Sequence, residues 1–402
     1  MRFRNVLFTA FFLASASGAG AGTIDAPYSI GTWHGFRHTA VSYTFDDNTP
    51  DHFQTVLPMF NEFGFPVTLF TVTDWVRDWN ELRSASAQGH EVASHSVTHP
   101  NFGNIGKSQQ IAEIENSRIV IQTQIPDKKC VTHAYPYCVT GNDSAMRANY
   151  IAGRICSGSN ESSNPANMMW LSSIVTGDQG SIRTTANFNS RMKGAVRGKQ
   201  WIVWLTHCVD GTGWSPTSPS EIRGSLEYLH TRQDTFWVAT FGAVARYILE
   251  RKAVDVHETA AGDTGITVQV TDTLDNAVFD HPVTLRRPLP EGWPFAVACQ
   301  AGLPIASSVI EVDGAKAIQF DAVPDAGEVV ISRRESAAVG IRANPAMPMP
   351  RSYQNYPNPF NPATTIEFSL PRSGKAELTL VDATGRTVAR LADGFYEAGT
   401  HR

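Results

Sequence analysis

Short apolar runs alternate with helical stretches over most of this chain, from about Thr39 to Val254. Such alternation predicts a parallel sheet, because each helix crosses over and brings the next strand back beside the last. We therefore expect an α/β fold whose strands form a distorted (β/α) barrel, closed or nearly closed. The expected strands are 40–45, 66–71, 91–94, 131–135, 151–156, 201–206 and 235–240; the expected helices are 52–63, 108–124, 220–229 and 241–252.

The character of the sequence changes after Val254. Residues 255–345 show apolar and polar alternation, as in 266–270, together with Pro-containing turns, which is typical of a small β-sandwich. Residues 343–350 are rich in Pro and Met and indicate a linker. We therefore expect a barrel domain over 22–254, small all-β sandwich modules after it, with an accessory module at 255–345, and a linker followed by a third β-rich segment at 346–402.

The first 21 residues have the pattern of an export signal. Arg2 and Arg4 precede a short apolar run at 6–14, and the small residues 19–21 form a cleavage site. The apolar run is too short for a bilayer, which takes about 20 residues, and no later stretch is apolar enough to span one. We expect residues 1–21 to be a signal peptide and the mature chain to be secreted or held at the cell surface, without a transmembrane segment.

The net charge and the cysteine content limit which partners and which disulfide bonds we expect. The formal net charge is −5 and no basic cluster is present, which argues against a nucleic-acid partner. An exported chain can form disulfides, but five cysteines leave at least one thiol outside any internal bridge. Small buried thiols are an equally good interpretation. If one bridge forms, our choice is Cys138 with Cys156, although the sequence offers no geometric support for it.

Polar side chains follow several of the expected strands. The pair Asp46-Asp47 follows the first strand, His95 the third, Tyr137 the fourth, and His207 the strand 201–206. In a parallel barrel, all strands end on the same face, so these side chains should converge there. This convergence is our main argument from the residues alone for a catalytic site.

Two of these residues, together with His99, fit a metal site. His95 and His99 lie four apart after a buried strand, and imidazole is a good ligand for zinc and similar ions. With Asp47 they form a three-ligand set with open positions, as in catalytic rather than structural zinc sites. Since strand side chains alternate, Asp46 points differently from Asp47 and can reach a water molecule.

Four segments resemble the motifs of a known family, the polysaccharide deacetylases (NodB homology, carbohydrate esterase family 4). The segments are Thr44-Phe45-Asp46-Asp47, His95-Ser96-Val97-Thr98-His99, Ala134-Tyr135-Pro136-Tyr137 and Leu205-Thr206-His207. Their order and spacing carry more weight than any one match, and together they cover roughly residues 38–253. The resemblance implies a metal-dependent hydrolase that removes acetyl groups from a polysaccharide.

The resemblance also implies a role for each matching residue. Asp46 is the general base that activates water, and His207 protonates the leaving group. Asp47, His95 and His99 hold a divalent metal, most often Zn²⁺ and sometimes Co²⁺ or another divalent ion. A metal of this kind lowers the pKa of water to about 7 and polarises the acetyl carbonyl.

Further positions are implied on the substrate side. The backbone N–H of Tyr137 stabilises the oxyanion, Leu205 lines the pocket for the acetyl methyl group, and Trp170 is a candidate for an aromatic wall. Asp178 and Asp210 are candidate acidic partners for the proton-donating histidine. From its position after a glycine-rich stretch, Trp214 is a candidate for stacking on a sugar.

The sequence departs from the family pattern at three positions. Ala134 stands where the family often has an arginine that orients the base carboxylate, and the neighbouring His133 is not an assured substitute. Asn48 and Cys138 stand where glycine is common. These changes bear on rate and substrate preference more than on metal binding.

A second resemblance concerns the C-terminal segment. Tyr356-Pro357-Asn358-Pro359-Phe360-Asn361-Pro362 and Gly385-Arg386 resemble the type IX secretion sorting domain, over about residues 353–402. This implies an immunoglobulin-like sandwich, cut short here, and makes the secretion machinery of a bacterial outer membrane a partner. An ordinary β-sandwich accessory module is the alternative.

Several functional interpretations remain open. The acetyl group could be an N-acetyl of chitin-like or peptidoglycan glycans or an O-acetyl of xylan, because water attacks a similar carbonyl in both. The chain could instead be a degenerate enzyme that binds carbohydrate or mediates adhesion, which the absence of the third-motif arginine favours. A purely structural metal site is a third interpretation and predicts metal-dependent folding without turnover.

Overall fold

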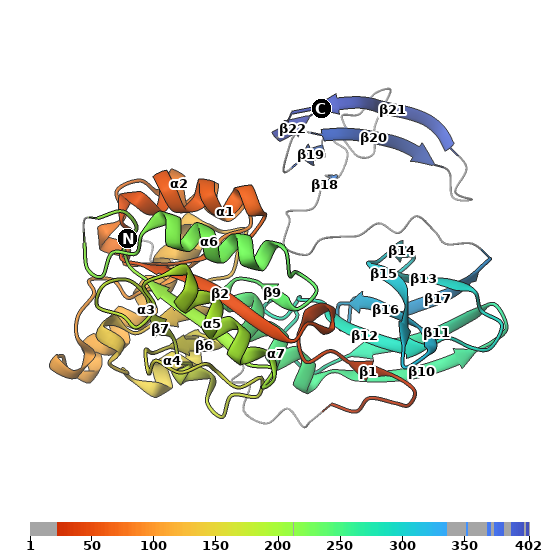
Figure 1. The fold of residues 1–402 in the computed structure, drawn as a ribbon, viewed down its shortest axis with the longest axis horizontal. Coiled ribbons are helices and arrows are strands. Elements are labelled where there is room, and N and C mark those ends of the chain that lie inside the picture. The colour runs from red at the N-terminus through yellow and green to blue at the C-terminus, as the bar shows by residue number, and fades with distance from the viewer. Residues whose placement is uncertain are drawn as a thin grey trace, which may run out of the picture. The chain divides into compact units, whose positions relative to one another are not determined.

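The computed structural model describes residues 22–211, 213–335, 351–352, 368–370, 374–381, 387–397 and 399–401 (Figure 1). The chain separates into two compact units, Met1–Arg342 and Ala343–Arg402. The expected signal peptide at 1–21, the linker at 343–350 and both sorting-domain motifs, at 356–362 and 385–386, lie outside the described residues.

An eight-stranded parallel sheet forms the centre of the first part of the larger unit. Its strand order is β6-β5-β4-β3-β2-β8-β7, and β9 also pairs with β2. The strands are β2 Thr39–Asp46, β3 Thr68–Thr71, β4 Glu91–Ser94, β5 Thr132–Ala134, β6 Ala152–Arg154, β7 Ile174–Val175, β8 Trp201–Thr206 and β9 Phe236–Val238. This sheet confirms the expected distorted (β/α) barrel.

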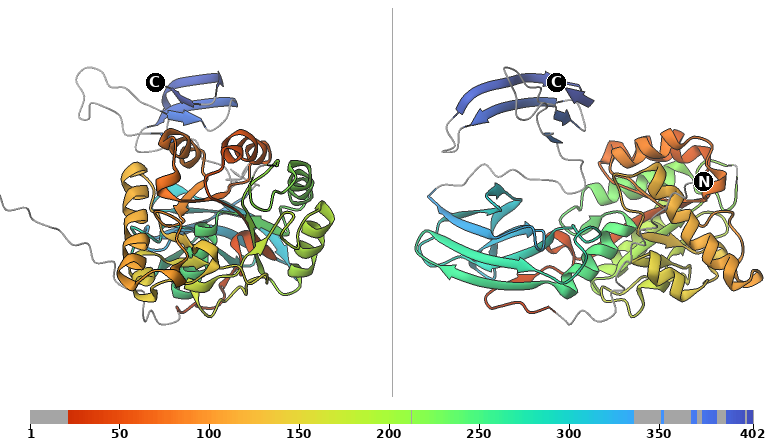
Figure 2. Two further views of the ribbon diagram at one scale, coloured as in Figure 1. Left: turned by 90° about the vertical axis from the view of Figure 1, so that its left-hand side faces the viewer. Right: turned by 180° about the vertical axis from the view of Figure 1, so that it is seen from behind.

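Helices cover the outer side of this sheet (Figure 2). They are α1 Leu57–Phe63, α2 Trp79–Ala87, α3 Lys107–Gln124, α4 Asp143–Asn149, α5 Thr185–Val196, α6 Pro219–His230 and α7 Phe241–Ala253. A π-helical turn, η2 His52–Val56, runs directly into α1, so the two together fill the expected helix 52–63. Gly64 ends α1 with φ 68°, a left-handed conformation that glycine adopts without strain.

Strand β2 sends alternate side chains to opposite sides of the sheet. Val41, Tyr43 and Phe45 pack in the apolar core beneath the helices. Thr44 and Asp46 lie on the other side and are also buried. The strand is therefore buried on both sides, and its alternation decides that Asp46 points into the barrel.

The part of the chain from 255 to 334 consists of antiparallel strands, as expected. They are β10 Asp255–Ala261, β11 Gly265–Thr271, β12 Val283–Pro288, β13 Phe295–Gln300, β14 Leu303–Pro304, β15 Ser307–Val312, β16 Ala315–Ala322 and β17 Val329–Arg334. They form two sheets, ordered β1-β12-β16-β15 and β10-β11-β17-β13-β14. The strand β1 Ser29–Ile30 joins them from the N-terminal side by pairing with β12.

Buried polar contacts and a shared apolar cluster hold this β-rich part against the barrel. His34 Nε2 lies 3.1 Å from Asp321 Oδ2, and the N–H of His281 donates to Glu250 Oε1 at 2.8 Å. Trp237 and Tyr247 of the barrel belong to the same apolar cluster as the strands β12 and β16. The two parts therefore form one unit.

The smaller unit contains short antiparallel strands: β18 Arg351–Ser352, β19 Phe368–Leu370, β20 Gly374–Val381, β21 Thr387–Tyr396 and β22 Gly399–His401. Strands β18, β19 and β22 form one sheet, and β20 pairs with β21. Among the described residues of the whole chain, no helix is both long and apolar enough to cross a membrane.

Candidate metal centre and catalytic site

The expected site residues stand at the ends of three strands of the parallel sheet. Asp46 is the last residue of β2 and Asp47 follows it, His95 directly follows β4, and His207 directly follows β8. All three strands run in the same direction, so their ends meet on one face. The convergence expected from the sequence is present.

Asp47, His95 and His99 form a compact group of potential ligands. Asp47 Oδ1 lies 3.6 Å from His95 Nε2 and 3.5 Å from His99 Nε2, and the three ligand atoms lie within 4.8 Å of one another. Two ligands bound at about 2.0–2.1 Å in tetrahedral geometry lie about 3.3 Å apart. Asp47 Oδ1 is buried and has no hydrogen-bond partner among the described residues, so the group fits a divalent cation.

The tautomer of His95 suits metal binding. Its Nδ1 lies 2.8 Å from the carbonyl oxygen of Ala134, which can only accept a hydrogen bond. Nδ1 therefore carries the proton, and Nε2 presents its lone pair toward Asp47. Burial lowers the pKa of His95 to about 3 and also lowers the pKa of His99, so both rings are neutral at pH 7 and can act as ligands.

The charge balance at Asp47 also indicates a cation. Burial, together with the negative charge of Asp46, raises the pKa of Asp47 to about 7. Two neighbouring carboxylates in a buried place repel each other. A divalent cation beside Asp47 offsets both effects.

Left-handed backbone conformations are concentrated at this site. Asp47, Ser96, His99 and Tyr137 have φ angles of 74°, 69°, 61° and 54°. Non-glycine residues rarely adopt this region, and where they do, the surroundings must hold them there. Asn48, where the family often has glycine, shares the conformation at φ 56°, which asparagine tolerates, and its Oδ1 accepts a hydrogen bond from the N–H of Val72 at 2.9 Å.

An arginine from another strand holds Asp46. Arg154 on β6 donates from Nη1 to Asp46 Oδ1 at 2.9 Å and from Nη2 to Oδ2 at 2.5 Å. Burial alone would raise the pKa of Asp46, but Arg154 together with His95 holds this pKa well below its usual range. His133 does not take this role, because its Nδ1 lies 2.9 Å from Ser94 Oγ. Arg154 was not among the expected site residues, because it lies outside the four motif segments.

His207 faces the same centre. Its Nε2 lies 3.9 Å from Asp47 Oδ2, and burial lowers its pKa to about 4. Its Nδ1 has no hydrogen-bond partner in the described part of the chain, so neither Asp178 nor Asp210 serves as its partner. His52 is buried behind His207, and its Nε2 lies 2.5 Å from the carbonyl oxygen of His207.

Exposed aromatic rings lie around the ligands. The rings of Trp75 and Tyr137 have their centroids 5.1 and 4.8 Å from that of His99, and the ring of Trp214 is 4.4 Å from that of His207. Each of these three side chains is about half exposed or more. They leave flat apolar surfaces open to solvent beside the metal centre.

The other two expected substrate-side residues differ in exposure. Trp170 ends the short helix η6 Met168–Trp170 and is half exposed, but no ring contact among the described residues joins it to the ligand histidines. Leu205 is buried within β8, where it pairs in register with Thr44. The structure thus brings Tyr137 to the ligand group more directly than Trp170.

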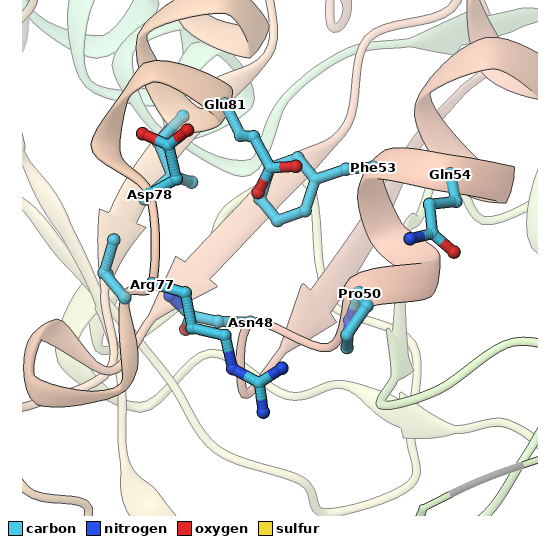
Figure 3. Close-up of a pocket in the computed structure, with 9 residues that line it drawn as sticks. Asn48, Pro50, Phe53, Gln54, Arg77, Asp78 and Glu81 are labelled. Atoms are coloured by element: carbon cyan, nitrogen blue, oxygen red, sulfur yellow. The ribbon is translucent and has the colours of Figure 1, made fainter.

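A cavity of about 290 Å³ lies beside Asn48. Figure 3 shows side chains that line it, with Asp78 and Arg77 at the left, Gln54 and Pro50 at the right, and Phe53 beside Glu81. The full lining consists of Asn48, Pro50, Phe53, Gln54, Val76, Arg77, Asp78, Glu81 and Leu82. Two of the lining residues, Asn48 and Val76, directly follow Asp47 and Trp75 in the sequence.

A disulfide links two segments that carry site residues. Cys138 and Cys156 are bonded, with their Cα atoms 5.6 Å apart, which confirms our choice of pair. Cys138 follows Tyr137, and Cys156 lies two residues after Arg154. Cys130, Cys208 and Cys299 are free thiols.

Comparison with known proteins gives one family match. Residues 35–152 match the family model described as polysaccharide deacetylase. This match supports a polysaccharide deacetylase domain in the first part of the barrel, in agreement with the motifs found in the sequence.

Two curated relatives and one solved structure illustrate the similarity. The chain is 28% identical to a gellan lyase of a Bacillus species over 324 residues, which are 75% of this chain and 13% of the relative. It is 30% identical over 106 residues to a chitooligosaccharide deacetylase of Sinorhizobium fredii (strain NBRC 101917 / NGR234), covering 26% and 49%. The Xyl-CE4 domain of a multidomain xylanase from the hindgut metagenome of Trinervitermes trinervoides is similar at 20% identity and a TM-score of 0.38, covering 51% and 88%. The chain spans less than half the length of these curated relatives.

Proposed function

We propose that this chain is a divalent-metal-dependent hydrolase that removes acetyl groups from a polysaccharide. The observation that carries the proposal is the group formed by Asp47, His95 and His99, with the ionised Asp46 beside it. Asp46 Oδ2 lies 3.6 Å from His95 Nε2, as close as the ligand atoms lie to one another. A base and a three-ligand set therefore occupy one buried place, as hydrolysis with activated water requires.

Each residue has a distinct task in the proposed reaction. A divalent cation, when bound, polarises the acetyl carbonyl and lowers the pKa of water. Asp46 accepts the proton of the attacking water, because its low pKa keeps it ionised at pH 7. His207 passes a proton to the departing nitrogen or oxygen, and the backbone N–H of Tyr137 donates to the oxyanion. Leu205 is proposed to shape the place of the acetyl methyl group.

The exposed rings support a polymeric substrate. Trp75, Tyr137 and Trp214 lie beside the ligand histidines, and flat aromatic faces suit the apolar faces of sugar rings. Trp170 adds a further exposed ring on η6. One curated relative is named as a chitooligosaccharide deacetylase, which is consistent with an N-acetyl substrate, but O-acetyl xylan suits the same site. Zn²⁺ is the proposed metal and Co²⁺ an alternative.

The competing interpretation, a degenerate carbohydrate-binding or adhesion protein, rested on the alanine at position 134. Arg154 weakens it, because a guanidinium contacts both oxygens of Asp46 from another strand. The base therefore does not lack the group that was expected to orient it.

The remaining proposals concern export. We propose that 1–21 are removed as a signal peptide, that 255–345 are an accessory module, and that the C-terminal unit is part of a type IX sorting domain recognised by secretion machinery. Expression in a bacterium with that machinery, with and without residues 346–402, tests this through the location of the protein and the mass of its mature N-terminus.

Acetate release tests the proposed activity. The protein is reconstituted with Zn²⁺ or Co²⁺ and incubated with acetyl-xylan and with N-acetylglucosamine oligomers in parallel, with a chelator and Asp46→Asn as controls. We expect release from one polymer class that both controls abolish. A metal-loaded protein that binds either glycan and releases no acetate would favour the binding protein instead.

A further inference from the structure

We propose that Arg154 is the positioning residue of the base Asp46, and that it supplies from β6 the guanidinium that position 134 lacks. The inference rests on the proposed function, because it assumes that Asp46 acts as a base. It adds a residue that none of the recognised motifs contains.

The contacts of Arg154 fix the plane of the Asp46 carboxylate. Its two terminal nitrogens contact different oxygens of Asp46, at 2.9 and 2.5 Å. Nη1 also donates to Thr44 Oγ1 at 2.8 Å, and that hydroxyl donates to the carbonyl oxygen of Trp204 at 2.7 Å. The guanidinium therefore makes two hydrogen bonds to the carboxylate and is itself held by Thr44, which restricts the carboxylate to one orientation.

The pair is sealed from solvent. Arg154 and Asp46 are each 1% exposed. The guanidinium carbon lies 4.7 Å from the ring centroid of Phe70, which is the register partner of Asp46 on β3. A buried charge is stable only beside a well-placed opposite charge, so Arg154 and Asp46 each limit the conformations of the other.

The strand register explains why β6 can supply this group. Ala134 and Arg154 are direct partners on the parallel strands β5 and β6, so their side chains lie on the same side of the sheet. Ala134 is buried in the same apolar cluster as Phe70 and Ala93. A small residue at position 134 leaves room in the interior for the side chain of Arg154. A guanidinium that contacts the base can therefore come from position 154 when position 134 carries no arginine.

Orientation of Asp46 has a second consequence. Asp46 Oδ2 is as far from His95 Nε2 as Asp47 Oδ1 is, 3.6 Å in both cases. A freed Asp46 could therefore turn and become an additional metal ligand. Arg154 keeps both oxygens engaged and thereby keeps the base out of the ligand set.

The main test compares Arg154→Lys and Arg154→Ala with the native protein loaded with Co²⁺. We expect kcat to fall by about 100-fold or more, within the range of a general base, with KM changed less than about twofold. We expect the visible Co²⁺ spectrum of Arg154→Ala to change as Asp46 joins the ligands. Asp46→Asn in the same variant should return the spectrum to that of the native protein.

Arg287→Lys is a matched control, because it also removes a partly buried guanidinium that contacts both oxygens of a carboxylate. Arg287 contacts both oxygens of Glu258 at 3.0 Å, outside the metal centre. We expect both Arg287→Lys and Arg154→Lys to lower the melting temperature, but only Arg287→Lys to leave kcat and the Co²⁺ spectrum unchanged.

Two rescues separate positioning from general stability. Guanidinium ion should restore part of the kcat of Arg154→Ala, whereas sodium chloride at the same concentration should not. The double variant Ala134→Arg/Arg154→Ala should regain more kcat than Arg154→Ala alone.

Folded, metal-loaded Arg154→Lys and Arg154→Ala with native kcat and a native Co²⁺ spectrum would overturn the inference, while the proposed function would stand if Asp46→Asn is inactive. If the native protein releases no acetate from any glycan, the proposed function fails instead. The spectra of Arg154→Ala, with and without Asp46→Asn, then still decide whether Arg154 holds Asp46 away from the metal.

Discussion

The disulfide between Cys138 and Cys156 joins the turn after β5 to the segment after β6. The residue before Cys138 is Tyr137, and the strand before Cys156 ends at Arg154. One covalent bond therefore links the turn proposed to bind the oxyanion with the strand proposed to orient the base.

Breaking this bond should loosen the site as well as the fold. The bond spans 18 residues, and a loop of that size corresponds to about 3 kcal/mol of unfolding free energy. We expect Cys138→Ser/Cys156→Ser to lower the free energy of unfolding by about that amount, and kcat/KM to fall because Tyr137 is less well held. Denaturant titration and acetate release measure the two effects. Cys299→Ser, at a free and partly exposed thiol, is the control and should change neither.

The ligand and base assignments predict different effects on metal content. His95→Ala removes a ligand, so we expect metal affinity to fall by more than about 100-fold and turnover to be lost with it. Asp46→Asn removes only the base, so we expect native metal content with kcat lowered by about 100- to 10,000-fold. Metal analysis after dialysis and acetate assays measure these outcomes. Full activity of Asp46→Asn would show that another group is the base.

The exposed rings should contribute to binding of the polymer rather than to the chemical step. Trp214→Ala removes a ring that packs on His207 and is half exposed. We expect KM for a long oligosaccharide to rise by about tenfold, as expected for a stacking contact of about 1.4 kcal/mol, with kcat for a small acetyl ester nearly unchanged. Equal losses on both substrates would assign the ring to holding His207 instead.

Glu250 predicts a dependence of stability on pH that is separate from the site. It is fully buried where α7 meets the β-rich part, near Asp272, Asp280 and Arg246, and burial raises its pKa from 4.5 to about 8. Between these values the unfolded state loses the proton while the folded state keeps it, so the contribution of Glu250 to stability falls as pH rises from 4.5 to 8.

Glu250→Gln should remove this dependence. A pKa raised from 4.5 to about 8 corresponds to about 4 kcal/mol at pH 8 and to about 5 kcal/mol at higher pH, with no effect well below pH 4.5. We expect the variant to be more stable than the native protein at pH 8 by up to that amount, and equally stable at pH 4. Thermal unfolding at both values measures this. A difference in stability between the variant and the native protein that is the same at pH 4 and at pH 8 would contradict it.

Much of the barrel could be predicted from the sequence. The expected strand 201–206 and helix 241–252 match β8 and α7 closely, because long apolar runs and regular spacing are local signals. The short strand β7 and the helices α2, α4 and α5 were not predicted. Their apolar residues are few or irregularly spaced, and packing against the sheet stabilises them.

The sequence by itself determined the alternation of strands and helices, and it placed Asp46, Asp47, His95 and His207 at strand ends, since alternation and motif spacing are properties of neighbouring residues. Only the tertiary structure decided that Arg154, 108 residues from Asp46, contacts both of its oxygens. That contact depends on the register between β5 and β6 and on the place of β6 in the sheet, four strands away from β2. Both arise from packing between distant segments, which no local pattern records.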